Sequence, residues 1–324
     1  EYPIRMNGFL VRKVESVGVR QQVWAKALAI GSDSEGAVVL ITVDTLGIPE
    51  EIREEIATRL HSKTGLRSEN LCITASHSHT APMINGCAPN IFGEPIPPDA
   101  QAHIDRYTTE LTDKLEQVAL AALKDRRDAT LHWGIGIVSF AKNRRDKAGP
   151  IDHDLPMLVV RDPDGRERAI YVSYACHCVT LSEPMIGGDW AGYAQQQIEK
   201  RYPQAIAMVS IGCAGDQNPS SGVVNDRADL ALGQGEEIAV EVDRLLDAKL
   251  RPVSGPIQVK RDVIELPLTT LPTREEFANL AQQQTPTGYF ARVQLAKLDR
   301  GEKLRQHIDY PVVSWSFGDS LAMV

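Results

Sequence analysis

Hydrophobic positions along the chain fall into two patterns. Short runs that are almost wholly apolar predict buried strands, whereas apolar residues that recur every three or four positions predict helices. The expected strands cover residues 23–30, 37–44, 71–74, 131–140, 155–161, 169–177, 205–211, 257–266, 312–317 and 320–324. The expected helices cover residues 49–61, 99–124, 190–202 and 226–249, with one or two more between 273 and 298. Strands and helices therefore share the chain throughout its length.

Turn residues connect several of these elements. Residues 31–36, rich in Gly, Ser and Asp, join the first two strands as a hairpin, and the second strand is apolar enough to be central in its sheet. Residues 162–165, with the sequence Asp-Pro-Asp-Gly, mark a second hairpin. Thr273 followed by Glu276 predicts a capping box at a helix start. Residues 82–99 are rich in Pro, Gly and Asn without periodicity, and a loop of that length is usually a lid or a binding wall.

Composition excludes some classes of function. The chain has 324 residues, 43% of them hydrophobic and 24% charged, as in an ordinary soluble globular protein. Its net charge of −8 argues against nucleic acid or an anionic membrane as partner, since both require a basic surface. The sequence has no apolar run long enough for a membrane helix and no basic-then-apolar leader. Five scattered cysteines favour free thiols over a disulfide framework. The oligomeric state and the compartment stay open, with secretion and the periplasm as options.

The strand that begins with residues 71–74 carries a pair of histidines, and Thr80-Ala81-Pro82 after them is expected to terminate it. Alternation of side chains along an extended strand predicts that His77 and His79 point to the same side, at the carboxyl end where open α/β sheets place their chemistry. One interpretation is a hydrogen-bonded pair that caps the sheet edge. The other is a transition-metal site, because neutral imidazole is a preferred ligand of zinc. The pair alone does not decide between them.

Three further segments bear on the choice between a hydrogen-bonded histidine pair and a metal site. His177 also ends an apolar strand, and alternation places Cys176 and Cys178 on the opposite side, which excludes a compact three-ligand site there. The glycine-rich turn of residues 212–219 can bring backbone N–H groups close to a ligand, or can be a tight turn alone. Residues 142–147 are either a solvated basic loop or a source of an arginine for a substrate carboxylate or carbonyl.

Asp189 precedes the helix of residues 190–202, and the N-cap position is its favoured interpretation over a catalytic role. Several familiar motifs are absent from the sequence: His-Glu-x-x-His, Gly-x-Ser-x-Gly, Gly-x-x-x-x-Gly-Lys and Gly-x-Gly-x-x-Gly after a strand. Simple nucleotide-binding and serine-hydrolase functions therefore lose their best support.

The order of four motifs resembles the neutral/alkaline (non-lysosomal) ceramidase family. These motifs are His77-Ser78-His79-Thr80-Ala81-Pro82, Lys142-Asn143-Arg144-Arg145, His177 with Gly188-Asp189-Trp190-Ala191-Gly192-Tyr193, and Gly215-Asp216-Gln217-Asn218-Pro219. The opening segment Tyr2–Gly8 is also similar to the family. The resemblance implies an α/β fold in which mixed β-sheets are stacked in the core and flanked by helices. Residues 1–324 would form a single large ceramidase-like metallohydrolase domain. Since the chain lacks an initial methionine and stops within an expected strand, we expect truncation at both ends.

The same resemblance implies a Zn²⁺-dependent amidase that cleaves the N-acyl bond of ceramide or a related lipid. His77 and His177 would be metal ligands, His79 a catalytic neighbour and Arg144 the active-site arginine. A glutamate and a tyrosine, the family's remaining ligands, would lie beyond Val324.

Two positions depart from the family pattern. Asn218 stands where the family has a serine, and an amide can donate to an oxyanion but cannot be a nucleophile. Thr80-Ala81 replaces Ser-Gly. Attack by metal-activated water is therefore expected, with Asn218 or Arg144 stabilising the negative charge. An apolar slot for the lipid is expected at Ile91, Phe92 and Ile96, which lie in the loop of residues 82–99.

Two other functions remain open from the sequence. One is a non-catalytic relative that binds a lipid or a glycan with an incomplete metal site. The other is a metal-dependent phosphoesterase, which Asp44, the Gly-Asp pair and the histidines suggest.

Overall fold

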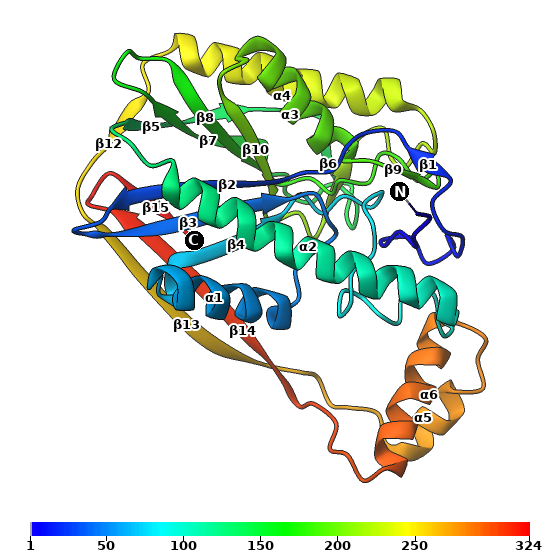
Figure 1. The fold of residues 1–324 in the computed structure, drawn as a ribbon. Coiled ribbons are helices and arrows are strands. Elements are labelled where there is room, and N and C mark those ends of the chain that lie inside the picture. The colour runs from blue at the N-terminus through cyan, green and yellow to red at the C-terminus, as the bar shows by residue number, and fades with distance from the viewer. Residues whose placement is uncertain (1) are drawn as a thin grey trace.

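Two β-sheets lie face to face in the core of the protein. The computed structural model describes residues 2–324 (Figure 1). The first sheet has the order β2-β3-β4 and comprises β2 (Ala25–Ser32), β3 (Gly36–Val43) and β4 (Leu71–Ala75). The second has the order β10-β8-β7-β5-β12 and comprises β5 (Thr130–Ile137), β7 (Asp154–Arg161), β8 (Glu167–Tyr174), β10 (Ile206–Ile211) and β12 (Arg251–Val253). Both sheets mix parallel and antiparallel pairs, because β3 runs parallel to β4 and β8 runs parallel to β10.

Helices cover the outer face of each sheet. The first sheet packs against α1 (Glu50–Thr64) and α2 (Pro98–Lys124), and the second against α3 (Asp189–Arg201) and α4 (Ala228–Asp247). The central strand β3 explains why the first sheet is covered on both faces, because its side chains alternate between two apolar surroundings. Val39 and Ile41 pack toward α1 and α2, whereas Val38 and Leu40 pack toward the second sheet. The predicted fold class, stacked mixed sheets flanked by helices, is confirmed.

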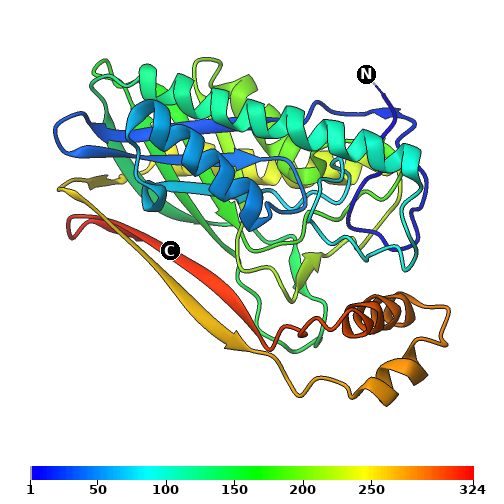
Figure 2. The ribbon, with the colours of Figure 1, turned by 60° about the horizontal axis from the view of Figure 1, so that its bottom comes forward.

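A long two-stranded ribbon extends from this core to a pair of short helices (Figures 1 and 2). It is formed by β13 (Ile257–Pro267) and β14 (His307–Phe317), and β15 (Leu321–Met323) joins its inner end. Trp315 and Phe317 bury that inner end against the second sheet. At the far end lie α5 (Arg274–Leu280) and α6 (Pro286–Asp299). The predicted capping box of Thr273 and Glu276 is present at the start of α5.

The smaller elements connect the loops at the carboxyl ends of the strands. Two short pairs join distant segments: β1 (Gly18–Val19) with β9 (Met185–Ile186), and β6 (Ala141–Asn143) with β11 (Gln217–Pro219). One 3₁₀ turn, η1 (Ser68–Asn70), precedes β4. All five cysteines are free, as predicted. Among residues 2–324, none of the helices is long and apolar enough to cross a membrane.

Several predicted boundaries were wrong near the strand ends. β4 ends at Ala75 and β8 at Tyr174, so His77 and His177 lie in the loops beyond their strands. Ladder pairing stops there because the partner strands β3 and β10 also end, at Val43 and Ile211. The directions of these histidines, and of the cysteines beside His177, are therefore not set by strand alternation.

Asp189 does not cap α3. The N-cap position belongs to Gly188, and no side chain caps this helix. Asp189 itself has a positive φ of 54° and is the first residue of the helix. Its carboxyl accepts N–H groups from Leu181 at 2.7 Å and from Trp190 at 2.6 Å. The residue therefore fixes the loop that follows His177.

The loop of residues 82–99 is present as predicted, but its apolar side chains are packed. Phe92 is 2% exposed and lies in a small cluster with Ile4, Met83 and Ile104. Ile91 and Ile96 pack against the same cluster. Phe92 is therefore part of the core and does not line the slot expected there, whereas Ile91 and Ile96 stay partly exposed.

Candidate metal site

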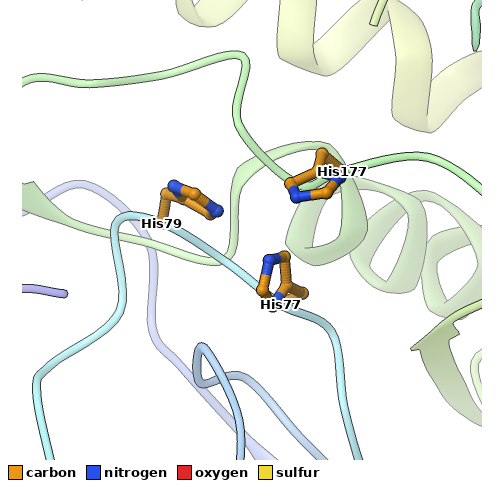
Figure 3. A group of neighbouring side chains, drawn as sticks. All are labelled: His77, His79 and His177. Carbon is orange, nitrogen blue, oxygen red and sulfur yellow. The ribbon is translucent and has the colours of Figure 1, made fainter. Parts of the chain in front are cut away.

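Three imidazole rings from two loops converge at the carboxyl ends of β4 and β8 (Figure 3). The centroid of the His77 ring lies 4.9 Å from that of His79 and 4.8 Å from that of His177, and His79 and His177 are 5.7 Å apart. One nitrogen of each ring lies within 4.8 Å of the others, as in a group that could hold a metal ion. His77 and His177, which are a hundred positions apart in the sequence, are thus neighbours.

His77 turns toward its partners because the backbone bends at that residue. Its φ is 59°, in the left-handed region where His is tolerated better than most residues. The predicted convergence of His77 and His79 is therefore correct, but its cause is this turn and not the alternation of a strand.

Backbone carbonyls orient two of the three rings. His77 Nδ1 lies 2.6 Å from the carbonyl oxygen of Leu46, and His177 Nδ1 lies 2.7 Å from that of Ala214. A carbonyl only accepts, so each Nδ1 carries the proton and each Nε2 keeps its lone pair. Metal-bound histidines usually show this arrangement, in which the second ring nitrogen donates to a carbonyl.

His79 differs from the other two histidines. Both of its ring nitrogens are buried, and neither has a hydrogen-bond partner within residues 2–324. A buried polar group without a partner costs roughly 1–3 kcal/mol. The ring is therefore placed for a ligand, a water or a substrate group that supplies the missing contact.

Burial keeps all three rings neutral. It is the largest cause that lowers the pKa of each histidine below the ordinary 6.5, to about 2 for His79 and about 4 for His177. The neighbouring imidazoles and the guanidinium groups of Arg12 and Arg144 act in the same direction. At neutral pH the lone pairs are therefore free to bind a cation.

Hydrogen bonds between loops fix the relative positions of the three histidines. The backbone N–H of His79 donates to the carbonyl of Cys178 at 3.0 Å, and that of His177 donates to Gln217 at 2.9 Å. The hydroxyl of Ser78 donates to the carbonyl of Gly187 at 2.9 Å. Three segments of the chain, after β4, β8 and β10, are thus joined around the site.

The other predicted site residues border this group. Arg144 is exposed and donates from Nε and Nη2 to the carbonyl of Gly215, at 3.2 and 2.8 Å, and its charge is close enough to lower the pKa of His77 and His177. Asn218 lies in β11, one residue beyond Gln217, which accepts from His177. Its side-chain oxygen is buried and has no partner in the described part of the chain.

Sequence reasoning missed the segment of residues 7–12, which packs on His79. The Phe9 ring lies 5.2 Å from the His79 ring, and Arg12 donates to the His79 carbonyl. A Cβ on Gly8 would lie 2.4 Å from His79 Nδ1, so only glycine fits there. The resemblance of residues 2–8 to the family was the only signal for this segment.

Fold and site together define a mixed α/β protein with a three-histidine centre at the carboxyl ends of its strands. The family described as neutral/alkaline non-lysosomal ceramidase, N-terminal, matches residues 2–224. That match covers more than half of the chain, so this protein belongs to the neutral/alkaline ceramidase family. No protein with a curated description matches it significantly.

Two solved structures share the fold. One is described as a ceramidase complexed with C2, with a TM-score of 0.73 and 17% identity over 98% of this chain and 59% of that one. The other is the neutral ceramidase from Pseudomonas aeruginosa, with a TM-score of 0.72 and 18% identity over 97% of this chain and 58% of that one. This chain thus spans less than two thirds of either structure.

Proposed function

We propose that the protein is a zinc-dependent amide hydrolase that cleaves the N-acyl bond of ceramide or a related N-acyl lipid. The observation that carries the proposal is the convergence of three neutral imidazoles, two of them with Nε2 directed by a backbone carbonyl on Nδ1. Membership of the ceramidase family supports the reaction class, and the fold shared with a ceramidase complexed with C2 supports a lipid substrate.

The residues fit a zinc ion. His77 and His177 would hold it through Nε2, and the carbonyls of Leu46 and Ala214 would fix both rings in the required tautomer. Zinc takes three or four such ligands, and the family resemblance places further ligands beyond Val324. When bound, zinc supplies a water with a pKa near neutrality and polarises a carbonyl group.

His79 would move the proton. Neither of its ring nitrogens has a hydrogen-bond partner within residues 2–324, so one of them could accept a proton from the attacking water and return it to the leaving amine nitrogen. The charge of Arg144 is close enough to lower the pKa of His77 and His177, and Asn218 follows Gln217, whose carbonyl accepts from His177. The N–H groups of these two side chains would stabilise the negative charge that develops on the amide oxygen.

Metal analysis and two assays test the proposal. The protein, extended past Val324 to include the expected glutamate and tyrosine, is stripped with a chelator and reloaded with Zn²⁺, and is expected to retain one equivalent by elemental analysis. His77→Ala and His177→Ala are expected to abolish retention, whereas His61→Ala, at the exposed end of α1, is the matched control. The loaded protein is then assayed on an N-acylsphingosine and on a generic phosphodiester.

Each outcome decides between the functions. Release of fatty acid that requires His77 and His177 supports the amidase. Turnover of the phosphodiester alone indicates a phosphoesterase. A folded protein that binds the N-acylsphingosine without zinc and without turnover is a lipid-binding relative, and the proposal is then wrong.

A further inference from the structure

Arg12 is a buried cation without an acidic partner. Its relative exposure is 7%, and burial alone lowers its pKa to about 10, so it stays charged at neutral pH. Within residues 2–324 no carboxylate offsets this charge. Burial of an unpaired guanidinium is costly unless its N–H groups are bonded, so the contacts that Arg12 makes define what it does.

Those contacts are backbone carbonyls from three separate segments. Nη2 donates to Asn7 at 2.7 Å and to His79, while Nη1 donates to Ser182 at 3.1 Å. Asn7 belongs to the N-terminal segment, His79 to the loop after β4, and Ser182 to the loop that follows His177. The planar guanidinium fork can bridge three acceptors in this way, whereas an ammonium group of one nitrogen cannot reproduce the spread.

The same segment also contacts the His79 ring. The guanidinium carbon of Arg12 lies 4.9 Å from the centre of the Phe9 ring, and Phe9 in turn meets His79 edge to face at 5.2 Å. Gly8, with φ 96°, leaves room for the imidazole. His79 is therefore held at its carbonyl by Arg12, at its N–H by Cys178 and at its ring by Phe9.

We propose that Arg12 is a positioning residue, which fixes the imidazole of His79 against those of His77 and His177 by tying the N-terminal segment to both histidine loops. It does not itself touch the ring nitrogens. Its effect on the metal rests on the proposed function, but its effect on the geometry of His79 does not.

Arg12→Lys keeps the charge and removes the fork. Arg53→Lys is the matched control, because Arg53 also joins backbone carbonyls, those of Ser68 and Leu71, at the other end of β4. Two measurements are made on each protein. The first is the long-range ¹⁵N–¹H spectrum of the histidine rings without metal, with the His79 signals assigned by His79→Gln. The second is the zinc affinity, by competition with a chromophoric chelator.

Arg12→Lys is expected to shift the His79 ring signals and to weaken zinc binding about 10–100-fold, as loss of a supporting contact does in metal sites. Arg53→Lys is expected to leave both unchanged even if its melting temperature falls equally. The proposal would be overturned if Arg12→Lys showed wild-type His79 ring signals while its melting temperature fell as much as that of Arg53→Lys.

Two further outcomes remain interpretable. If the wild-type protein binds no zinc, the proposed function fails, while the ring spectrum still decides the role of Arg12. If Arg12→Lys does not fold, Arg12→Gln replaces it, since a side-chain amide can still donate to one of these carbonyls but cannot bridge all three. Wild-type His79 signals in Arg12→Gln would then overturn the proposal.

Discussion

Acid should destabilise the metal-free protein through His177. The residue is 8% exposed, and burial is the main reason why its folded-state pKa is about 4 instead of 6.5. Between these two values the unfolded chain binds a proton that the folded chain does not. The stability contributed by neutral His177 is therefore complete above pH 6.5 and is lost as the pH falls toward 4.

The two pKa values set the size of the effect. Linkage between proton binding and folding gives a loss of about 2 kcal/mol between pH 8 and pH 5, which rises to about 3 kcal/mol below pH 4. His79 and His77 add to the loss in the same direction, since burial lowers their pKa values too. Replacement of His177 by Gln removes one such ring and leaves an amide that can still donate to the carbonyl of Ala214.

Urea denaturation of chelator-treated protein measures this effect. The free energy of unfolding is followed by circular dichroism at half-unit steps from pH 8 to pH 4.5. Wild-type protein is expected to lose about 2 kcal/mol more than His177→Gln between pH 8 and pH 5, because His77 and His79 are present in both proteins. Parallel profiles for the two proteins would show that the imidazole is not held neutral by burial, and the account of the site's electrostatics would be wrong.

Three other predictions address the metal and the core. Zn²⁺ at about one hundred times its dissociation constant should stabilise the stripped protein by about 2.7 kcal/mol, measured as a rise in melting temperature that His77→Ala does not show. Tyr174→Phe removes an O–H that donates to Val138 at 2.8 Å, and should cost about 1–3 kcal/mol in urea; no loss would mean that the bond contributes nothing. Gly235→Ala should destabilise by about 1–3 kcal/mol, because a Cβ there would lie 2.6 Å from the backbone N of Ala194 in α3. Gly233→Ala, in the same helix with no atom within 4 Å, should instead stabilise by about 0.5–1 kcal/mol, and equal effects of the two changes would contradict the close contact of α3 with α4.

The pattern of apolar residues predicted the strands and helices, and the family resemblance predicted how they stack in layers. In β3, Val38 and Leu40 face one side while Val39 and Ile41 face the other, and each set is apolar because each packs on a different layer. Such a strand must lie in a sheet that is covered on both faces, because one set would otherwise be exposed to water. The regular part of the fold therefore followed from local periodicity, and the position of both histidine loops at strand ends followed with it.

Local periodicity stops where the strands end. It therefore does not predict how the loops of the site are arranged. The left-handed turn at His77, the Cys178 carbonyl that holds the backbone of His79 and the burial of Arg12 all depend on partners distant in the sequence. Phe92 is a further example, since an aromatic residue in a polar loop reads equally well as a binding wall or as core.

The sequence by itself determined the alternation of strands and helices, the free cysteines and the two segments that carry the histidines. Only the tertiary structure decided that three rings meet, which ring nitrogens stay free, and that Gly8, Phe9 and Arg12 enclose His79. The physical reason is that apolar patterning records which side of an element is buried, whereas contacts between loops arise from hydrogen bonds and close packing that form only when the sheets have come together.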